Sequence, residues 1–140
     1  MRQYIIASHA HFATGIKESI ELLSGARDNV HDLSMFVDDR MDVAEEAQKL
    51  LAGMSADDDV VVCTDLFGGS VNNEMLTLLP EYPAVHLICG MNASLVLTLA
   101  SNDEALTQDE LAECIADAKA QIIDCNLLLK NAAQDEEDDL

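Results

Sequence analysis

The chain has 140 residues, which is enough for one domain with a substantial hydrophobic core. A formal net charge of −20 at pH 7 argues against nucleic acid as a partner and is compatible with docking onto a basic protein surface. The sequence contains no apolar run of the roughly 20 residues that cross a bilayer, and no secretory signal, so we expect a cytoplasmic protein.

Short apolar segments alternate along the chain with segments of helical periodicity. Strands are predicted at residues 3–7, 30–36, 60–64 and 84–89, and helices at residues 13–24, 38–53, 71–79, 93–100 and 107–123. In the first helix, Ile16, Ile20 and Leu23 lie along one face. Strands and helices that alternate with short connections predict an α/β, doubly wound domain whose strands form one parallel sheet.

The C-terminal part of the chain has a weaker pattern. Residues 125–129 are apolar and fit either a continuation of the last helix or one short strand. Residues 131–140 include five consecutive acids and are expected to be a disordered tail, so the predicted domain covers residues 1–130. The four cysteines form no CxxC pair, and we expect reduced, packed thiols rather than a zinc site.

The third predicted strand runs directly into a glycine turn. Asp65 closely follows the β-branched run of residues 60–62, at the carboxyl end of a strand that is expected to be buried on both faces. Gly68 and Gly69 allow a sharp turn, and Ser70 is a suitable N-cap for the next helix. The peptide N–H groups of such a turn can hold a phosphate or an oxyanion, although an ordinary strand-to-helix turn has the same composition.

The first predicted strand leads into two histidines, His9 and His11. Side chains at the carboxyl ends of neighbouring parallel strands converge on one crevice, so one of these histidines is expected to meet Asp65. Because side chains alternate along a strand, both histidines project the same way, and the spacing does not choose between them. An imidazole held by a carboxylate, next to free N–H groups, is suited to carrying a phosphoryl group on nitrogen.

Two other interpretations of these residues stay open. An HxH pair with Asp65 would suit a metal-dependent hydrolase. Such a site needs further ligands, which His31, His86 and the cysteines are badly placed to supply. The third interpretation is that the histidines and Asp65 are structural, or bind a small anion without chemistry.

Two segments resemble one known family. Residues 8–15, SHAHFATG, resemble the SHGxxAxG segment of the mannose-type enzyme IIA domains of the bacterial phosphoenolpyruvate:sugar phosphotransferase system, and residues 65–73, DLFGGSVNN, resemble their DLFGGSPxN segment. Ala10 and Val71 stand where the family has glycine and proline. The resemblance implies a parallel sheet of four strands in the order 2-1-3-4 with helices on both faces. It also implies a homodimer in which a short C-terminal antiparallel strand is exchanged, for which residues 125–129 are the candidate.

The resemblance assigns roles to single residues. His9 would be phosphorylated on Nε2, with Asp65 bound to the other ring nitrogen. His11, which the family segment does not specify, is kept as either a secondary acceptor or a rim residue. The residues that would hold the phosphoryl oxygens or support the site are Ser8, Gly68, Gly69 and Ser70. An apolar rim for partner docking would include Phe12, Phe67 and Met91, and the alternative is that the phenylalanines lie in the core. No metal is expected, and no cofactor other than the transient phosphohistidine.

The partners follow from the same resemblance. In the family, the phosphoryl group comes from the histidine phosphocarrier HPr and passes to a histidine on enzyme IIB, and enzymes IIC and IID move the sugar through the membrane. The chain would thus be a phosphotransferase component with a phosphohistidine intermediate. Two alternatives remain: a regulatory domain that is titrated by phosphorylation, and the related phosphocarrier subunit of dihydroxyacetone kinase.

Overall fold

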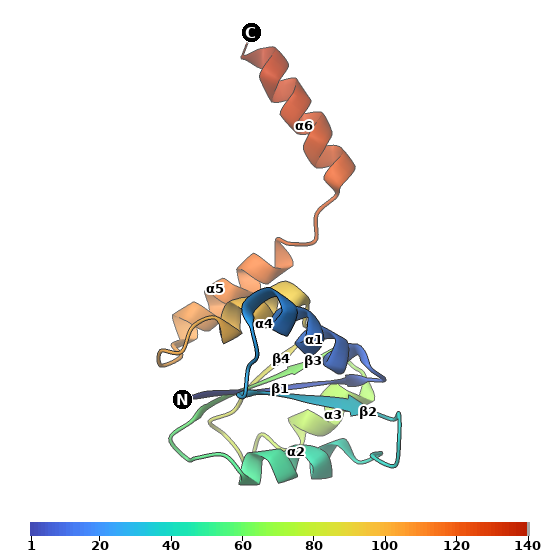
Figure 1. Cartoon of the computed structure of the whole chain (residues 1–140), viewed down its shortest axis with the longest axis vertical. Coiled ribbons are helices and arrows are strands. Elements are labelled where there is room, and N and C mark those ends of the chain that lie inside the picture. The colour runs from blue at the N-terminus through green and yellow to red at the C-terminus, as the bar shows by residue number, and fades with distance from the viewer. Residues whose placement is uncertain (140) are drawn as a thin grey trace.

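In the computed structural model, which describes residues 1–139, strands and helices alternate along most of the chain (Figure 1). The elements are β1 (Arg2–His9), α1 (Phe12–Ser24), β2 (Val30–Met35), α2 (Val43–Ala52), β3 (Asp59–Thr64), α3 (Ser70–Leu76), β4 (His86–Cys89), α4 (Ala93–Ala100), α5 (Gln108–Lys119) and α6 (Cys125–Asp138). All four predicted strands are present, within about two residues of the predicted bounds. Within residues 1–139, no helix is long and apolar enough to cross a membrane.

The strands form one parallel sheet in the order β2-β1-β3-β4, which confirms the predicted topology. β1 is flanked by β2 and β3, and Ala7 of β1 pairs with Leu33 of β2 and with Thr64 of β3. This register aligns the carboxyl ends of the three strands at one edge of the sheet. The residues that follow these strands are therefore brought close together.

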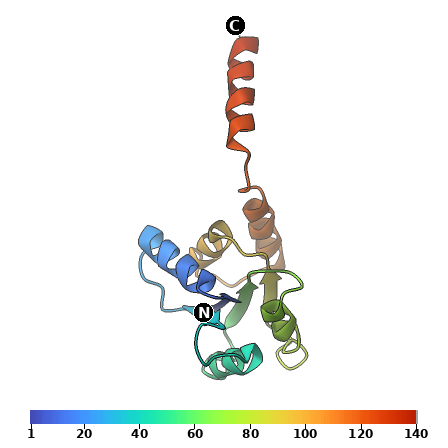
Figure 2. The ribbon, with the colours of Figure 1, turned by 90° about the vertical axis from the view of Figure 1, so that its right-hand side faces the viewer.

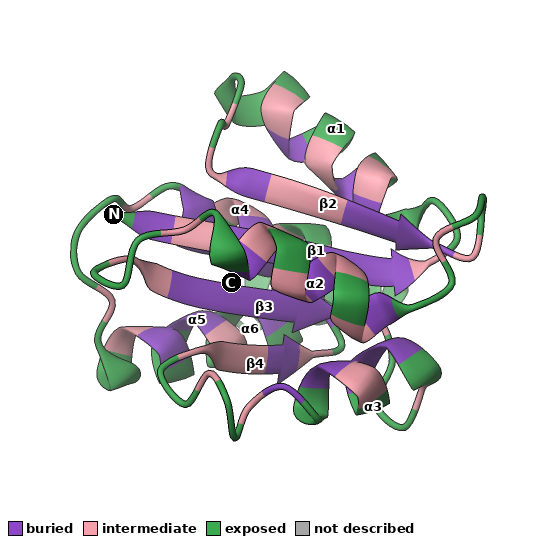
Figure 3. Ribbon diagram, turned by 90° about the horizontal axis from the view of Figure 1, so that it is seen from below, coloured by how far each residue is buried: buried purple, intermediate pink, exposed green. Residues whose placement is uncertain are grey.

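Helices cover both faces of the sheet, as predicted (Figures 1 and 3). α1, α4 and α5 pack on one face, and α2 and α3 pack on the other. Side chains of β1 alternate between the two cores, with Tyr4 and Ile6 on one side and Ile5 and Ala7 on the other. Ile5 and Ile6 have no exposed surface, and burying each such side chain contributes roughly 1.5–3 kcal/mol. The buried sheet is a firm support for the residues at its carboxyl edge.

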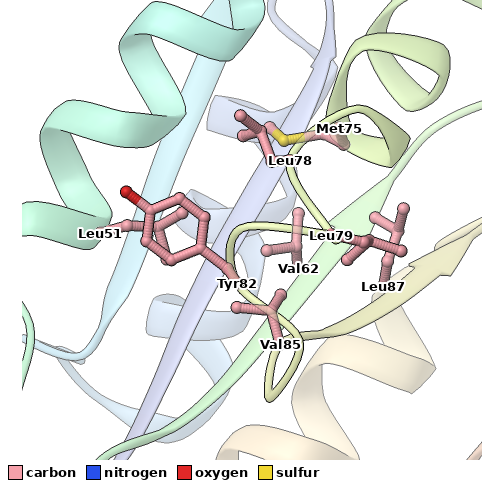
Figure 4. Close-up of a pocket in the computed structure, with 8 residues that line it drawn as sticks. All are labelled: Leu51, Val62, Met75, Leu78, Leu79, Tyr82, Val85 and Leu87. Atoms are coloured by element: carbon pink, nitrogen blue, oxygen red, sulfur yellow. The ribbon is translucent and has the colours of Figure 1, made fainter. Parts of the chain in front are cut away.

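A small apolar cluster holds α3 against the sheet (Figure 4). Leu51 of α2, Val62 of β3 and Met75 of α3 line the same hollow, and Tyr82 covers it from the loop after α3. The other lining residues are Leu78, Leu79, Val85 and Leu87. Because α3 begins directly after the glycine turn, this packing determines where Ser70 lies.

The amino end of β1 is anchored by a buried arginine that the sequence pattern did not indicate. Arg2 is 1% exposed and donates to the carbonyl oxygens of Leu99 at 3.1 Å and Glu104 at 2.7 Å. Its guanidinium also forms an ion pair with Glu110 of α5. The Tyr4 hydroxyl donates to the Leu99 carbonyl oxygen at 2.6 Å. These partners satisfy the buried charge and tie β1 to α4 and α5.

The C-terminal part of the chain is helical, and a helix was one of the two alternatives for residues 125–129. α5 ends at Lys119, and residues 125–129 begin α6 rather than form a strand. Asp124 starts this helix by accepting the N–H of Leu127 at 3.1 Å. α6 continues through most of the tail that was expected to be disordered. No residue of α6 is buried, and the helix projects away from the sheet (Figures 1 and 2). Cys125 is exposed there, so the prediction that all cysteines are packed was wrong.

Candidate active site

The carboxyl ends of β1 and β3 bring a histidine and an aspartate into contact. His9 is the last residue of β1, and Asp65 follows β3 directly. Asp65 Oδ2 lies 2.8 Å from His9 Nδ1 and also accepts the backbone N–H of His9 at 2.8 Å. The other oxygen, Oδ1, accepts the N–H of Leu66 at 3.0 Å. Both oxygens are engaged, and the carboxylate holds the imidazole in one orientation.

The carboxyl group of Asp65 favours its ionised form in this setting. Burial raises its pKa, but the hydrogen bonds from the backbone and ring of His9, together with the charge of that ring, outweigh burial, and the pKa of Asp65 lies below its ordinary value of 3.8. An ionised carboxylate only accepts hydrogen bonds, so the proton of the neutral imidazole is on Nδ1. Nε2 then carries the lone pair and is the nucleophilic nitrogen of this site.

The Nε2 side of the imidazole faces the start of α3. Ser70 Oγ lies 3.1 Å from His9 Nε2, a distance at which the hydroxyl can donate to the lone pair. The prediction that Ser70 is the N-cap of this helix was wrong. Gly69 is the N-cap and Ser70 is the first helical residue, so its hydroxyl meets the imidazole instead of a backbone N–H. The His9 side chain is 40% exposed, which leaves room for a reacting group to approach.

The two glycines of the turn are required for different reasons. Gly68 has φ of 79°, a backbone conformation that other residues rarely adopt. Gly69 has an ordinary φ of −76°, but a Cβ added there would lie 3.2 Å from His9 Cε1 and 3.2 Å from the Leu66 carbonyl oxygen. Gly68 therefore allows the chain to turn, and Gly69 allows the turn to lie directly against the imidazole.

Ser8 supports the loop that carries the histidine rather than the reacting atoms. It is buried, and its Oγ accepts the N–H of Ala13 at 2.7 Å and donates to the carbonyl oxygen of Ala10 at 3.2 Å. Ala10 has φ of 52°, and its N–H donates to the carbonyl oxygen of Met35 at 2.9 Å. The left-handed backbone at Ala10 accounts for the glycine that the resembling family has at this position.

The structure separates the two histidines that sequence spacing could not distinguish. His11 lies outside β1, as the N-cap residue of α1, and its side chain is exposed. The pKa of Asp38, in the loop after β2, is lowered mainly by its hydrogen bonds with Arg40 and to a smaller extent by the nearby His11. His9 is the histidine that contacts Asp65.

The three residues predicted for an apolar rim divide into two exposed and one buried. Phe12 and Phe67 are 49% and 85% exposed. Met91 is only 4% exposed, so the prediction that it contributes to a surface rim was wrong. The Met91 N–H donates to the carbonyl oxygen of Thr64 at 3.0 Å, and the preceding Gly90 has φ of 78°. This turn directs the Met91 side chain into the core beneath α4.

One aromatic neighbour of His9 was missed from the sequence. Phe36 follows β2, and the centroids of its ring and of the His9 imidazole are 5.7 Å apart, with 37° between the ring planes. The sequence predicted Phe36 only as the end of a strand. Its position beside the end of β1, in a parallel sheet, was the signal that could have identified it.

Additional metal ligands are not gathered around these residues. Within residues 1–139, no group of three or more histidine, cysteine or acidic side chains is arranged to hold a metal ion. His31 Nε2 lies 2.9 Å from Gln3 Oε1, and His86 begins β4, at the opposite end of that strand from the site. The donor set of a hydrolytic metal centre is therefore incomplete.

Comparison with known proteins gives one consistent result. The model of the EIIA-man family, described as "PTS system fructose IIA component", matches residues 3–116. A solved structure from Klebsiella pneumoniae, assigned to a phosphoenolpyruvate-dependent sugar phosphotransferase system (PTS), is 37% identical, with a TM-score of 0.79 over 91% of this chain and 93% of the other. The PTS IIA protein associated with the fucose utilisation operon of Streptococcus pneumoniae is 26% identical, with a TM-score of 0.79 and coverage of 91% and 96%.

A curated relative agrees with these structures. The sorbose-specific EIIA component of the PTS of Lacticaseibacillus casei is 23% identical over 121 residues, which are 85% of this chain and 86% of the relative. The family model spans most of the chain, from the first strand to α5, and the solved relatives share the fold. The chain therefore belongs to the EIIA-man family and is an EIIA-type component of a sugar phosphotransferase system.

Proposed function

We propose that His9 carries a phosphoryl group, which it accepts on Nε2 and then passes on. The observation that carries this proposal is the bond between His9 Nδ1 and the ionised Asp65, which leaves a lone pair on an accessible Nε2. In the transfer, this lone pair attacks phosphorus, the bond from Nε2 to phosphorus forms, and the bond from phosphorus to the donor histidine breaks. The electron pair of the broken bond returns to the donor imidazole, while the imidazole of His9 becomes cationic and is stabilised by Asp65.

The remaining residues of the site supply positioning. We assign Ser70 and the turn at Gly68 and Gly69 to the phosphoryl oxygens, because Ser70 Oγ lies 3.1 Å from Nε2 and Gly69 lies against the ring. Transfer between two imidazoles needs alignment and charge neutralisation more than covalent help from the protein. The proposal therefore includes no resident metal and no organic cofactor.

The proposed donor is HPr and the proposed acceptor is a histidine of enzyme IIB, with enzymes IIC and IID acting later on the sugar. The reaction would take place in the cytoplasm. The exposed Phe12 and Phe67 fit an apolar docking surface close to the site. The net charge of −20 would attract a partner with a basic face, and this attraction should weaken as salt is added.

The test is to incubate the purified chain with phosphoenolpyruvate, enzyme I and HPr, and to map the modified residue by mass spectrometry under conditions that preserve phosphohistidine. We expect one acid-labile phosphate on His9 and none in His9→Ala. Full phosphorylation of His9→Ala would overturn the assignment. A phosphate on His11 would keep the carrier function and move the site.

A second step separates a carrier from a regulatory domain. The loaded protein is mixed with candidate enzyme IIB proteins, and the decay of the phosphohistidine is followed. A carrier transfers its phosphoryl group to at least one of them, whereas a domain that is only titrated by phosphorylation loads from HPr and does not unload. Failure to load at all would contradict both interpretations.

We extend the proposal to a homodimer that involves α6. Its side chains Leu127, Leu128 and Leu129 are 54%, 57% and 72% exposed, and an isolated helix of this length is marginal in water without a packing partner. Sedimentation equilibrium of the full chain should therefore show a dimer. A monomer at all concentrations would contradict this part of the proposal.

A further inference from the structure

The imidazole of His9 is contacted from several sides. Asp65 engages Nδ1 and Ser70 Oγ lies beside Nε2. Gly69 lies so close to Cε1 that a Cβ at this position would be only 3.2 Å away. The aromatic neighbour of the imidazole is Phe36, with ring centroids 5.7 Å apart. An imidazole that is held at these positions, although it is partly exposed, has little freedom to rotate about its bond to Cβ.

The backbone of Phe36 is in an unusual conformation. Its φ is 67°, in the left-handed region that glycine adopts easily and a bulky side chain does not. Strain of this kind persists where surrounding contacts require it, and it is concentrated at functional sites. A glycine at this position would adopt the same backbone conformation without strain. The presence of phenylalanine therefore suggests that its ring has a function.

The contacts around Phe36 keep its ring in place. Its backbone N–H donates to the carbonyl oxygen of Arg40 at 3.2 Å, which closes the loop after β2. The preceding Met35 accepts the N–H of Ala10 at 2.9 Å, and this bond joins the loop to the turn that follows His9. The ring is partly buried and packs against the core on the α2 and α3 face of the sheet. It therefore presents a fixed surface to the imidazole.

We propose that Phe36 is a positioning residue for phosphoryl transfer: its ring limits the rotation of the His9 imidazole and keeps Nε2 directed at the incoming phosphoryl group. The inference rests on the proposed function of His9. Phe36 acts through the imidazole and not on the phosphoryl group itself. Its loss is therefore expected to lower the rate of transfer within the complex with HPr, and not the affinity for HPr.

The test compares two substitutions at Phe36 with one at another phenylalanine of the site. Phe36→Leu removes the ring and keeps apolar volume, Phe36→Tyr keeps the ring, and Phe67→Leu makes the same change as the first at an 85% exposed position. For each protein we would measure the rate of phosphoryl acceptance at increasing concentrations of phosphorylated HPr. Here kcat is the maximal rate of acceptance, and KM is the concentration of phosphorylated HPr that gives half of this rate. We would also record the proton NMR signals of the His9 ring in the unphosphorylated protein, because a nearby aromatic ring shifts them.

We expect Phe36→Leu to lower kcat about tenfold with KM within about twofold of the original, since small misplacements of a reacting group are costly. Its His9 ring signals should move, and Phe36→Tyr should retain both kcat and the signals. Phe67→Leu should instead raise KM and leave kcat in place, as expected for a docking residue.

Three results would overturn the inference. The first is an unchanged kcat in Phe36→Leu, and the second is a rise in KM at constant kcat, which would make Phe36 a docking contact. The third is an equal loss of kcat in Phe36→Tyr. If the original protein loads normally and one of these results is found, only the role of Phe36 fails. If the original protein does not load on His9, the proposed function fails and the inference falls with it.

Discussion

Asp65→Asn keeps the size of the side chain but replaces one hydrogen-bond acceptor by a donor. Oδ2 of Asp65 accepts two N–H groups from His9, and Oδ1 accepts the N–H of Leu66. The single oxygen of asparagine can serve only one of these sides. If the asparagine oxygen accepts the N–H of Leu66, the amide NH₂ faces His9. The imidazole then accepts a hydrogen bond at Nδ1 and carries its proton on Nε2. If the asparagine oxygen stays on His9, two donors meet at Leu66.

Both arrangements weaken the site, and the first favours the tautomer with its proton on the nucleophilic nitrogen. The hydrogen bond between a charged carboxylate and the imidazole is of the kind that contributes about 1.5–3 kcal/mol. The imidazole becomes cationic as the phosphoryl group arrives, so this loss falls on the transition state and the phosphorylated product. At about 1.4 kcal/mol for each factor of ten in rate, the expected decrease in the rate of phosphoryl acceptance is about 10- to 150-fold.

The assay is rapid-quench measurement of transfer from phosphorylated HPr to the original protein and to Asp65→Asn. Asp57→Asn is the matched control, because it removes the same charge from an exposed position in the loop before β3, at the opposite edge of the sheet. Circular dichroism should show that both variants are folded. A rate for Asp65→Asn within twofold of the original would refute the reasoning, and so would an equal decrease in Asp57→Asn.

Three further predictions concern the turn, the buried arginine and pH. Gly69→Ala keeps an ordinary φ, but its Cβ presses on His9 Cε1 and on the Leu66 carbonyl oxygen. Phosphoryl acceptance should therefore fall about two- to tenfold, and an unchanged rate would mean that the ring yields freely. Arg2→Ala leaves Glu110 and the facing carbonyl oxygens without their partner. The free energy of unfolding, measured by urea titration, should therefore fall by about 3 kcal/mol. A decrease of less than about 1 kcal/mol would show that the contact is dispensable. The pKa of Asp65 is lower in the folded than in the unfolded chain, so its stabilisation is present above about pH 4 and is lost as the pH falls through the folded-state pKa. The difference in unfolding free energy between the original and Asp65→Asn, measured by urea titration, should therefore shrink as the pH falls below about 4; a difference that does not change there would contradict this prediction.

The elements of the fold that could be predicted are those with strong local signals. The β-branched residues 60–62 indicated a buried strand, and the structure places them in β3. The last helix was predicted to start at residue 107, and Thr107 is its N-cap, with Oγ1 accepting the N–H of Glu110 at 3.1 Å. The apolar residues 125–129 were ambiguous because their composition fits a strand or a helix. The capping carboxylate of Asp124 favours the helix, and that signal was overlooked.

The site was predictable where it depends on topology and not where it depends on the direction of a side chain. His9 and Asp65 were expected to meet because the ends of neighbouring parallel strands converge, and they do. Met91 and Phe36 each follow a strand through a turn with a left-handed residue, Gly90 at φ of 78° and Phe36 itself at φ of 67°. After such a turn the alternation of side chains along a strand no longer applies. The burial of Met91 and the contact of Phe36 with the imidazole therefore required the structure.

The most direct test of the central claim is to determine which nitrogen carries the phosphoryl group. Protein with ¹⁵N-labelled histidine would be loaded through HPr and examined by NMR for coupling between phosphorus and each ring nitrogen. Because Nδ1 of His9 is bound to Asp65, we predict coupling to Nε2 of His9, with Nδ1 remaining protonated. Coupling to Nδ1 of His9, or to either nitrogen of His11, would contradict the assignment.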